Sequence, residues 1–304
     1  MIIVKPDIVS TTTLTASNVG IGEYSDWAAG SYGAGNRVRY QPAGEPFVLV
    51  YESLVTTTDR PDDGVAANPP TWARVGAVNR FKMFDSTTSS QTESAGVIDL
   101  TVTPTAPYDA LVLLGVEGSS VQLIVRDGGG VVRYDETRSL ADYSNVTGFY
   151  SYFFGELPLD AQAAVTFLDI PNYTSATYRL IILKAGGTAK CAEAVFGRAS
   201  ELAVTNFGSS VGIKDYSVKR VDDFGNVQII ERPFSKRANF DLKIETNEVG
   251  VFNRFMASLR ATPVVYIGDE GREETIIFGY YRDFNVVLSG PSISTCSLEI
   301  EGLT

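Results

Sequence analysis

Histidine is missing from this sequence of 304 residues, and its absence excludes several kinds of active site. Ser-His-Asp and Cys-His nucleophilic sites need an imidazole as the general base. Histidine-containing zinc sites and the HExxH metalloprotease motif need imidazole nitrogens as ligands. We therefore expect a protein that is not an enzyme and that holds neither a metal ion nor a cofactor.

Cysteine is almost missing as well, with Cys191 and Cys296 as the only thiols. The chain starts Met1-Ile-Ile-Val-Lys-Pro, without the basic and then apolar layout of a secretory signal. Disulfides are rare in proteins that stay in the cytosol. We therefore expect two buried free cysteines rather than a disulfide.

Long apolar runs and a basic surface are lacking too. No run approaches the ~18 apolar residues of a membrane-spanning helix, so we expect no membrane insertion. The 25 Lys and Arg residues are outnumbered by 36 Asp and Glu, which gives a net charge of −11. Nucleic-acid binding needs clustered Lys and Arg, so we expect no nucleic-acid partner.

The sequence does contain many short apolar runs between Gly, Pro, Asn and Asp, a pattern typical of a mainly β protein. Its length suits two or three domains of ~100–150 residues. We expect an extended N-terminal arm (1–23), a small aromatic-rich module (24–76), a central β-sandwich (77–205) and a C-terminal sheet or barrel domain with one helix (206–304). The arm would lie on a neighbouring subunit or form a simple first strand.

The module at 24–76 has an aromatic pattern of its own. Its sequence runs Asp26-Trp27, Gly30-Ser-Tyr32-Gly-Ala-Gly-Asn-Arg-Val38-Arg-Tyr40, Phe47-Val-Leu-Val-Tyr51-Glu-Ser-Leu54 and Asn68-Pro-Pro-Thr-Trp72. This is similar to the small carbohydrate-binding modules of chitinases, which show a Trp, then Tyr-x-x-Gly-Asp-x-Val, a second Tyr and a closing Trp. Asn36 stands where that pattern has Asp. The resemblance implies a small β module that can contact sugars.

The aromatic side chains of this module have two competing uses. A unit this small needs aromatic residues in its core, which favours core positions for Trp27, Tyr32, Val38 and Trp72. Exposed rings would instead stack on sugars, and Tyr40 and Tyr51 are the remaining candidates for that platform. Residues 52–63 lack the Trp pair of chitin-binding members, so the fold analogy is stronger than the chitin specificity. The candidate carbohydrate-binding residues are Tyr40, Tyr51, Trp27 and Trp72.

Runs of strand length predict the central β-sandwich. They lie at 110–114, 121–125, 131–134, 164–168 and 177–183. Turn residues separate them at 118–120, 127–130 and 185–187. The triplet Gly128-Gly-Gly130 is predicted as a hairpin turn rather than a phosphate loop, because neither GxxxxGK[ST] nor a helix accompanies it.

The C-terminal domain combines strand patterns with one helix. Phe240, Leu242 and Ile244 alternate with polar residues, as in a strand with one wet face. A helix is predicted over 247–261, capped by Thr246 or Asn247 and ended by Pro263. Its apolar stripe would be Val249, Phe252, Phe255, Met256 and Leu259. Further strands are expected at 264–267, 275–281, 284–288 and 297–303.

Several short segments of this domain, in one order, resemble the tail-tip (baseplate) proteins of tailed bacteriophages of the siphophage type. They are Val211-Gly-Ile-Lys-Asp-Tyr-Ser217, Asp222-Asp-Phe-Gly225, Ile230-Glu-Arg-Pro-Phe-Ser-Lys-Arg237, Leu259-Arg-Ala-Thr-Pro263, Phe278-Gly-Tyr-Tyr-Arg-Asp-Phe284 and residues 296–303. Asn79-Arg-Phe-Lys-Met-Phe-Asp85 and Tyr150-Ser-Tyr-Phe-Phe154 extend the resemblance toward the N-terminus.

The resemblance implies a structural subunit of the virion tail, made in the host cytoplasm before assembly. Its expected partners are copies of itself in a cyclic homo-oligomer of three-fold or six-fold symmetry, other tail proteins and, through the 24–76 module, host cell-surface polysaccharide. Interfaces favour aromatic residues and Arg. The candidate interface residues are Arg232, Phe234, Arg237, Tyr280, Tyr281 and Phe284, unless these simply belong to ordinary strands.

Two other functions are weighed against this one. The first is a dedicated adsorption protein that binds host glycan. The second is a tail glycosidase, which needs two carboxylates ~5–9.5 Å apart in a cleft. The adjacent acids Asp62-Asp63, Asp222-Asp223 and Glu273-Glu274 are poor candidates, because neighbours on a strand point to opposite faces and acid pairs on loops are commonly solvated.

Overall fold

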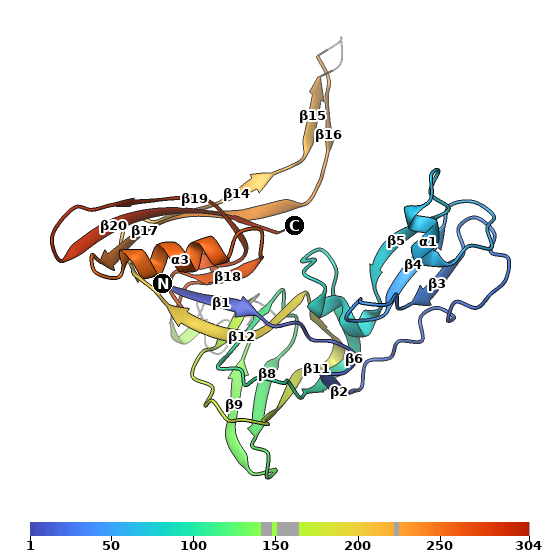
Figure 1. The fold of residues 1–304 in the computed structure, drawn as a ribbon, viewed down its shortest axis with the longest axis horizontal. Coiled ribbons are helices and arrows are strands. Elements are labelled where there is room, and N and C mark those ends of the chain that lie inside the picture. The colour runs from blue at the N-terminus through green and yellow to red at the C-terminus, as the bar shows by residue number, and fades with distance from the viewer. Residues whose placement is uncertain (141–147, 151–163, 222–224, 304) are drawn as a thin grey trace.

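The computed structural model describes residues 1–140, 148–150, 164–221 and 225–303 (Figure 1). Strands make up most of its regular structure, so the expected mainly β fold is confirmed. The described strands form sheets of ten, five, three and two strands. Most of the segment 150–154 and the pair Asp222-Asp223 lie outside the described residues.

The ten-stranded sheet is antiparallel and has the order β10-β7-β12-β1-β18-β19-β20-β17-β13, with β14 pairing with β17 as well. Its strands are β10 (Ala164–Phe167), β7 (Ala110–Leu114), β12 (Glu193–Glu201), β1 (Ile2–Pro6), β18 (Val264–Ile267), β19 (Ile276–Val287), β20 (Ile293–Gly302), β17 (Phe234–Glu245), β13 (Val204–Thr205) and β14 (Ser210–Asp215). The sheet crosses the boundary expected between 205 and 206, so its hydrogen bonds join the sandwich to the C-terminal domain.

Strand β1 lies inside this sheet, between β12 and β18. Ile3 and Val4 are fully buried and belong to different cores, because successive side chains of a strand point to opposite faces. Gly197 of β12 allows the close approach, since a Cβ there would lie 2.0 Å from the carbonyl oxygen of Lys5. Residues 2–6 therefore form a first strand rather than an arm lying on another subunit, because burial on both faces stabilises them within their own sheet.

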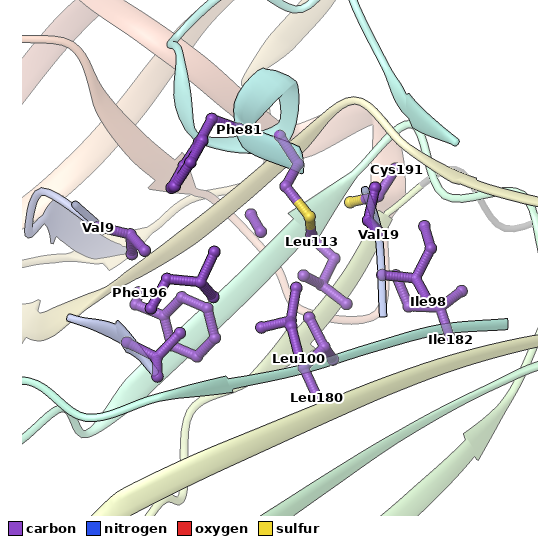
Figure 2. Packing of buried hydrophobic residues seen from close by; sticks show 14 of the residues in the cluster. Val9, Val19, Phe81, Ile98, Leu100, Leu113, Leu180, Ile182, Cys191 and Phe196 are labelled. Carbon is purple, nitrogen blue, oxygen red and sulfur yellow. The ribbon is translucent and has the colours of Figure 1, made fainter. Parts of the chain in front are cut away.

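A five-stranded sheet covers one face of strands β10, β7 and β12. It has the order β2-β6-β11-β8-β9 and contains β2 (Leu14–Ser17), β6 (Thr92–Val102), β11 (Thr177–Cys191), β8 (Ser120–Arg126) and β9 (Val132–Ser139). Figure 2 shows the core between the two sheets, where Leu113 and Phe196 meet Leu100, Leu180 and Ile182. This is the expected central β-sandwich.

Two of the glycine-rich turns predicted in the sandwich behave differently. The turn at 127–130 joins β8 to β9, and the Asp127 carboxylate accepts hydrogen bonds from the backbone N–H groups of Gly129 and Val131 at 2.9 and 3.0 Å. The predicted break at 185–187 is wrong, because β11 continues through it. The pairing of β11 with β6 shifts between Leu183 and Thr188, so these glycines lie in a β-bulge, where a missing Cβ is tolerated.

The module at 24–76 is built on a three-stranded sheet of β3 (Arg37–Tyr40), β4 (Leu49–Ser53) and β5 (Trp72–Ala77), with the short helix α1 (Pro61–Ala66) beside β5. Its core continues into that of the sandwich. Phe47 stacks on Phe81 of the 3-10 helix η1 (Asn79–Phe84), with ring centroids 5.4 Å apart. The module is thus fixed to the sandwich by apolar contacts.

The C-terminal strands curl around α3 (Val249–Ser258), as Figure 1 shows. The predicted stripe is confirmed: Phe252, Met256 and Leu259 are buried, and Val249 and Phe255 pack against the same core. The predicted cap is wrong, because Glu248 occupies the N-cap position and no side chain caps the helix. A turn at 246–248 leads into the helix, and Thr246 Oγ1 donates to the carbonyl oxygen of Gly290 instead.

Strand β19 replaces the two strands expected at 275–281 and 284–288. The 3-10 helix η2 (Glu273–Thr275) precedes it. The pairing of β19 with β20 shifts between Tyr281 and Asp283, which inserts one extra residue. Because side chains alternate along a strand, that insertion places Tyr281 and Phe284 on the same face although they are three positions apart.

Candidate assembly interface

The aromatic residues proposed for sugar stacking lie mostly inside the module. Trp72 is 1% exposed and its indole N–H donates to the carbonyl oxygen of Asp59 at 3.1 Å. Tyr51 is 4% exposed, and burial raises the pKa of its hydroxyl. A ring buried this fully presents no face to a ligand, so neither residue can form a sugar platform.

Trp27 and Tyr40 are half-buried and remain accessible in part. Their rings meet edge to face with centroids 5.7 Å apart, and Tyr40 in turn contacts Tyr51 at 6.4 Å. The indole nitrogen of Trp27 is buried and has no hydrogen-bond partner among the described residues. These two rings are the part of the predicted platform that reaches the surface.

A cleft of about 280 Å³ with a mixed polar and apolar lining lies where the module meets η1 and the segment after it. Tyr24, Arg37, Lys82 and Asp85 are among the residues that line it. Arg37 donates to Glu52 at 2.7 Å and to the hydroxyl of Tyr24 at 3.3 Å, and burial raises the pKa of the Asp85 carboxyl. This cleft could not be predicted from local sequence patterns, because its lining runs from Glu23 to Ser90.

Of the adjacent acids considered for a glycosidase, the two pairs within the described residues lie in short helices. Asp62 and Asp63 occupy the first turn of α1, where Arg60 lies 2.7 Å from one carboxylate and 3.3 Å from the other. Glu273 and Glu274 lie in η2. Ion pairing of the first two with Arg60 is the arrangement of a solvated helix start.

The predicted interface residues on β19 fall on two faces. Tyr281 and Phe284 point toward the core, where Phe284 meets Phe252 of α3 at 5.9 Å and Tyr281 at 5.6 Å. Tyr280 is exposed on the opposite face. Of these three aromatic residues, only Tyr280 is placed for contact with another chain.

Arg237, Arg232 and Phe234 lie on or beside β17. Arg237 is exposed and forms an ion pair with Glu299 of β20. Phe234, at the start of β17, is exposed, and so is Arg232 two residues before it. Phe234 and Arg232 lie at the base of an element that the sequence patterns did not predict.

That feature is a two-stranded ribbon of β15 (Val218–Val221) and β16 (Val227–Ile230), which we call the projecting ribbon. Figure 1 shows it extending well away from the remaining sheets. Cross-strand partners lie on the same face, and Val221 pairs with Val227 while Ile229 pairs with Lys219. Val221, Val227 and Ile229 therefore share one face, where they are 68%, 61% and 63% exposed.

The base of the ribbon is fixed by a buried carboxylate. The side chain of Glu301, on β20, is 6% exposed and accepts hydrogen bonds from Lys214 Nζ at 2.6 Å and from the Tyr216 hydroxyl at 2.8 Å. The hydrogen bond from Lys214, followed by that from Tyr216, lowers the pKa of Glu301. These contacts hold the segment between β14 and the ribbon against the curled sheet.

Both cysteines are buried and free, as expected. Burial raises the pKa of Cys296 to about 11 and also raises that of Cys191, so both remain thiols at neutral pH. Among the described residues, no helix is long and apolar enough to cross a membrane.

Comparison with known proteins adds no family to this description. No family model matches the chain, and a search of curated proteins finds no significant match.

Proposed function

We propose that this chain is a structural subunit that associates with copies of itself around a symmetry axis, as part of the tail tip (baseplate) of a tailed bacteriophage. The phage assignment rests on the sequence resemblance described above. Self-association rests on the projecting ribbon. Cyclic symmetry of three or six subunits would allow identical contacts to close into a ring.

The single observation that carries the proposal is the apolar face of the ribbon. A two-stranded ribbon is marginally stable in water when nothing packs on it. Exposing Val221, Val227 and Ile229 together on such an element is unfavourable by about 25 cal/mol for each Å² of apolar surface. Contact with another molecule would remove that surface from water, and the anchor at Glu301 holds the ribbon ready for contact.

A double substitution in the ribbon tests this proposal. Val227→Ser with Ile229→Ser leaves the length of the ribbon unchanged but makes its apolar face polar. This double variant should shift the protein from oligomer toward monomer in size-exclusion chromatography with light scattering. Val287→Ser with Leu288→Ser is the matched control, because these two residues are also exposed and apolar but lie away from the ribbon, at the last residue of β19 and the residue after it. Equal loss of mass in both variants would count against a specific role for the ribbon.

The tail-tip assignment is tested on the particle itself. Immunogold labelling with an antibody to this chain should mark the distal end of the virion tail. Washed virions without the chain would contradict the assignment, even if the purified protein oligomerises.

A second candidate function is binding of host surface glycan by the 24–76 module. The partly accessible pair Trp27 and Tyr40 and the cleft beside Arg37 favour it. Tyr40→Ala should weaken binding to host polysaccharide on a glycan array, whereas Lys243→Ala, on the far curled sheet, should not. Tyr51→Ala is unsuitable as a test, because removing a core ring would also unfold the module. Absence of binding by the unmodified protein would leave the module as a spacer.

A further inference from the structure

A broad groove of about 770 Å³ lies on the curled sheet, beside the edge formed by β13 and the start of β14. Segments 201–211 and 268–275 line it. Its apolar part includes Val204, Phe207 and Val211, all exposed, and the ring of Phe207 is 99% exposed. A phenylalanine in full contact with water is unfavourable, so this groove has the character of an unfilled contact surface.

The groove carries three carboxylates and two cationic groups. Glu201, Asp269 and Glu274 line it together with Arg272 and the N-terminal residue Met1, whose amino group interacts with Glu201. Arg272 lies 3.4 Å from Asp269 and neutralises that carboxylate in part. Glu274 has no cationic partner among residues 1–140, 148–150, 164–221 and 225–303, so its charge is available to a neighbour.

The projecting ribbon is complementary in both respects. Its apolar face carries Val221, Val227 and Ile229, and Lys219 lies on that same face. The contact of Lys219 with Asp215 is long, at 3.9 Å between two exposed side chains, and such pairs are weak. Lys219 is therefore free to pair with a carboxylate of another molecule once the apolar face docks.

The ribbon cannot fill the groove of its own chain. Strand β14 starts at Ser210 beside the groove, which Val211 helps to line, and runs to Asp215, where it leads toward the ribbon. The anchor of Lys214 and Tyr216 on Glu301 fixes the far end of this path. Figure 1 shows the ribbon extending away from the curled sheet. The ribbon therefore does not reach the groove, which lies on that sheet beside β13.

We propose that the ribbon of one copy docks into the groove of the next copy, with Val221, Val227 and Ile229 against Val204 and Phe207 and with Lys219 facing Glu274. This inference rests on the proposed self-association and names the surface that receives the ribbon. Ribbon and groove are different surfaces, so the contact is head-to-tail. Repetition of a head-to-tail contact gives a closed ring when the rotation between copies closes.

Cysteine cross-linking tests the pairing. The chain with Ile229→Cys is mixed with the chain carrying Phe207→Cys, under mild oxidation. The native cysteines are buried, so only the introduced thiols react readily. The mixture should give a disulfide-linked dimer of the two chains, at least about tenfold above a mixture of Ile229→Cys with Leu288→Cys, because thiols held in contact react far faster than thiols that meet by diffusion.

A charge exchange gives a second readout. Lys219→Glu and Glu274→Lys should each weaken self-association about tenfold, because each places like charges together. The chain that carries both substitutions should restore it, because every head-to-tail contact then pairs opposite charges again. An unmodified protein that is monomeric would overturn both this inference and the proposed function. An oligomer that shows neither the cross-link nor the restoration would overturn the docking inference alone.

Discussion

The ammonium group of Lys214 lies 2.6 Å from Oε1 of Glu301, and this pair joins the base of the projecting ribbon to strand β20. The Glu301 side chain is almost fully buried, whereas that of Lys214 is partly exposed. The hydroxyl of Tyr216 donates to the same carboxylate oxygen. The direction of the ribbon therefore depends on one charged group near the C-terminus of the chain.

Replacing that group should loosen the ribbon. Glu301→Gln removes the charge that receives both hydrogen bonds, and we expect the free energy of unfolding to fall by about 1–2 kcal/mol in urea titrations at neutral pH. Glu299→Gln is the matched control, because Glu299 forms more exposed ion pairs with Arg237 and Arg282 and should cost less.

The effect of Glu301→Gln on the free energy of unfolding should depend on pH. The pKa of Glu301 is lowered in the folded protein, so its contribution is present above the ordinary glutamate range and is lost as the pH falls through the lowered pKa. The stability difference between the unmodified protein and Glu301→Gln should shrink on acidification. A difference in stability that stays constant from neutral to acidic pH would contradict a stabilising role for the hydrogen bonds of Lys214 and Tyr216 to Glu301.

The ionised carboxyl group of Glu193 is expected to destabilise the folded protein, in contrast to that of Glu301. It is buried on β12, its Oε2 atom has no hydrogen-bond partner among the described residues, and burial raises the pKa of this carboxyl well above its usual value. A raised carboxyl pKa disfavours the folded state above the unfolded pKa. Glu193→Gln should therefore stabilise the protein at neutral pH by at least about 1 kcal/mol and change little at low pH. Loss of stability at neutral pH would show that the ionised carboxylate has a partner.

The position of β1 inside the ten-stranded sheet is tested at Gly197. A Cβ at this residue would lie 2.0 Å from the carbonyl oxygen of Lys5, so Gly197→Ala must push β1 and β12 apart. We expect a loss of several kcal/mol in thermal or urea unfolding, or no soluble protein. Gly212→Ala on β14 is the control, since nothing lies within 4 Å of a Cβ there. Equal stability of the two variants would contradict the pairing of β1 with β12.

The packing of α3 under the curled sheet is tested at Phe252. This ring is 1% exposed and meets Phe284 edge to face. Phe252→Ala should cost about 3–5 kcal/mol by urea unfolding, because it leaves a cavity in the core. Val251→Ala, an exposed neighbour on the same helix, should change the free energy of unfolding by less than about 1 kcal/mol.

Much of the fold follows from patterns in the sequence. The alternation of Phe240, Leu242 and Ile244 matches the buried positions of β17, and the stripe from Val249 to Leu259 matches the buried face of α3. These predictions succeed because a local periodicity reports directly which side of an element is buried.

Other features depend on pairing between distant segments. Nothing local to residues 2–6 shows that they lie between β12 and β18, and a bulge at Arg282 decides that Tyr281 and Phe284 face the core. The ribbon also depends on such pairing, because the spacing of Val227 and Ile229 indicates a strand with one apolar face but not that this strand stands apart from the other sheets. That this apolar face is exposed follows only from the three-dimensional structure, in which no other strand packs on it among the described residues.

The mass of the full-length protein in solution tests the central claim most directly. Sedimentation velocity over a range of concentrations should show an oligomer that dissociates in the Val227→Ser, Ile229→Ser variant and persists in the Val287→Ser, Leu288→Ser variant. An unmodified chain that sediments as a monomer of 32.9 kDa at every concentration would contradict the proposed self-association.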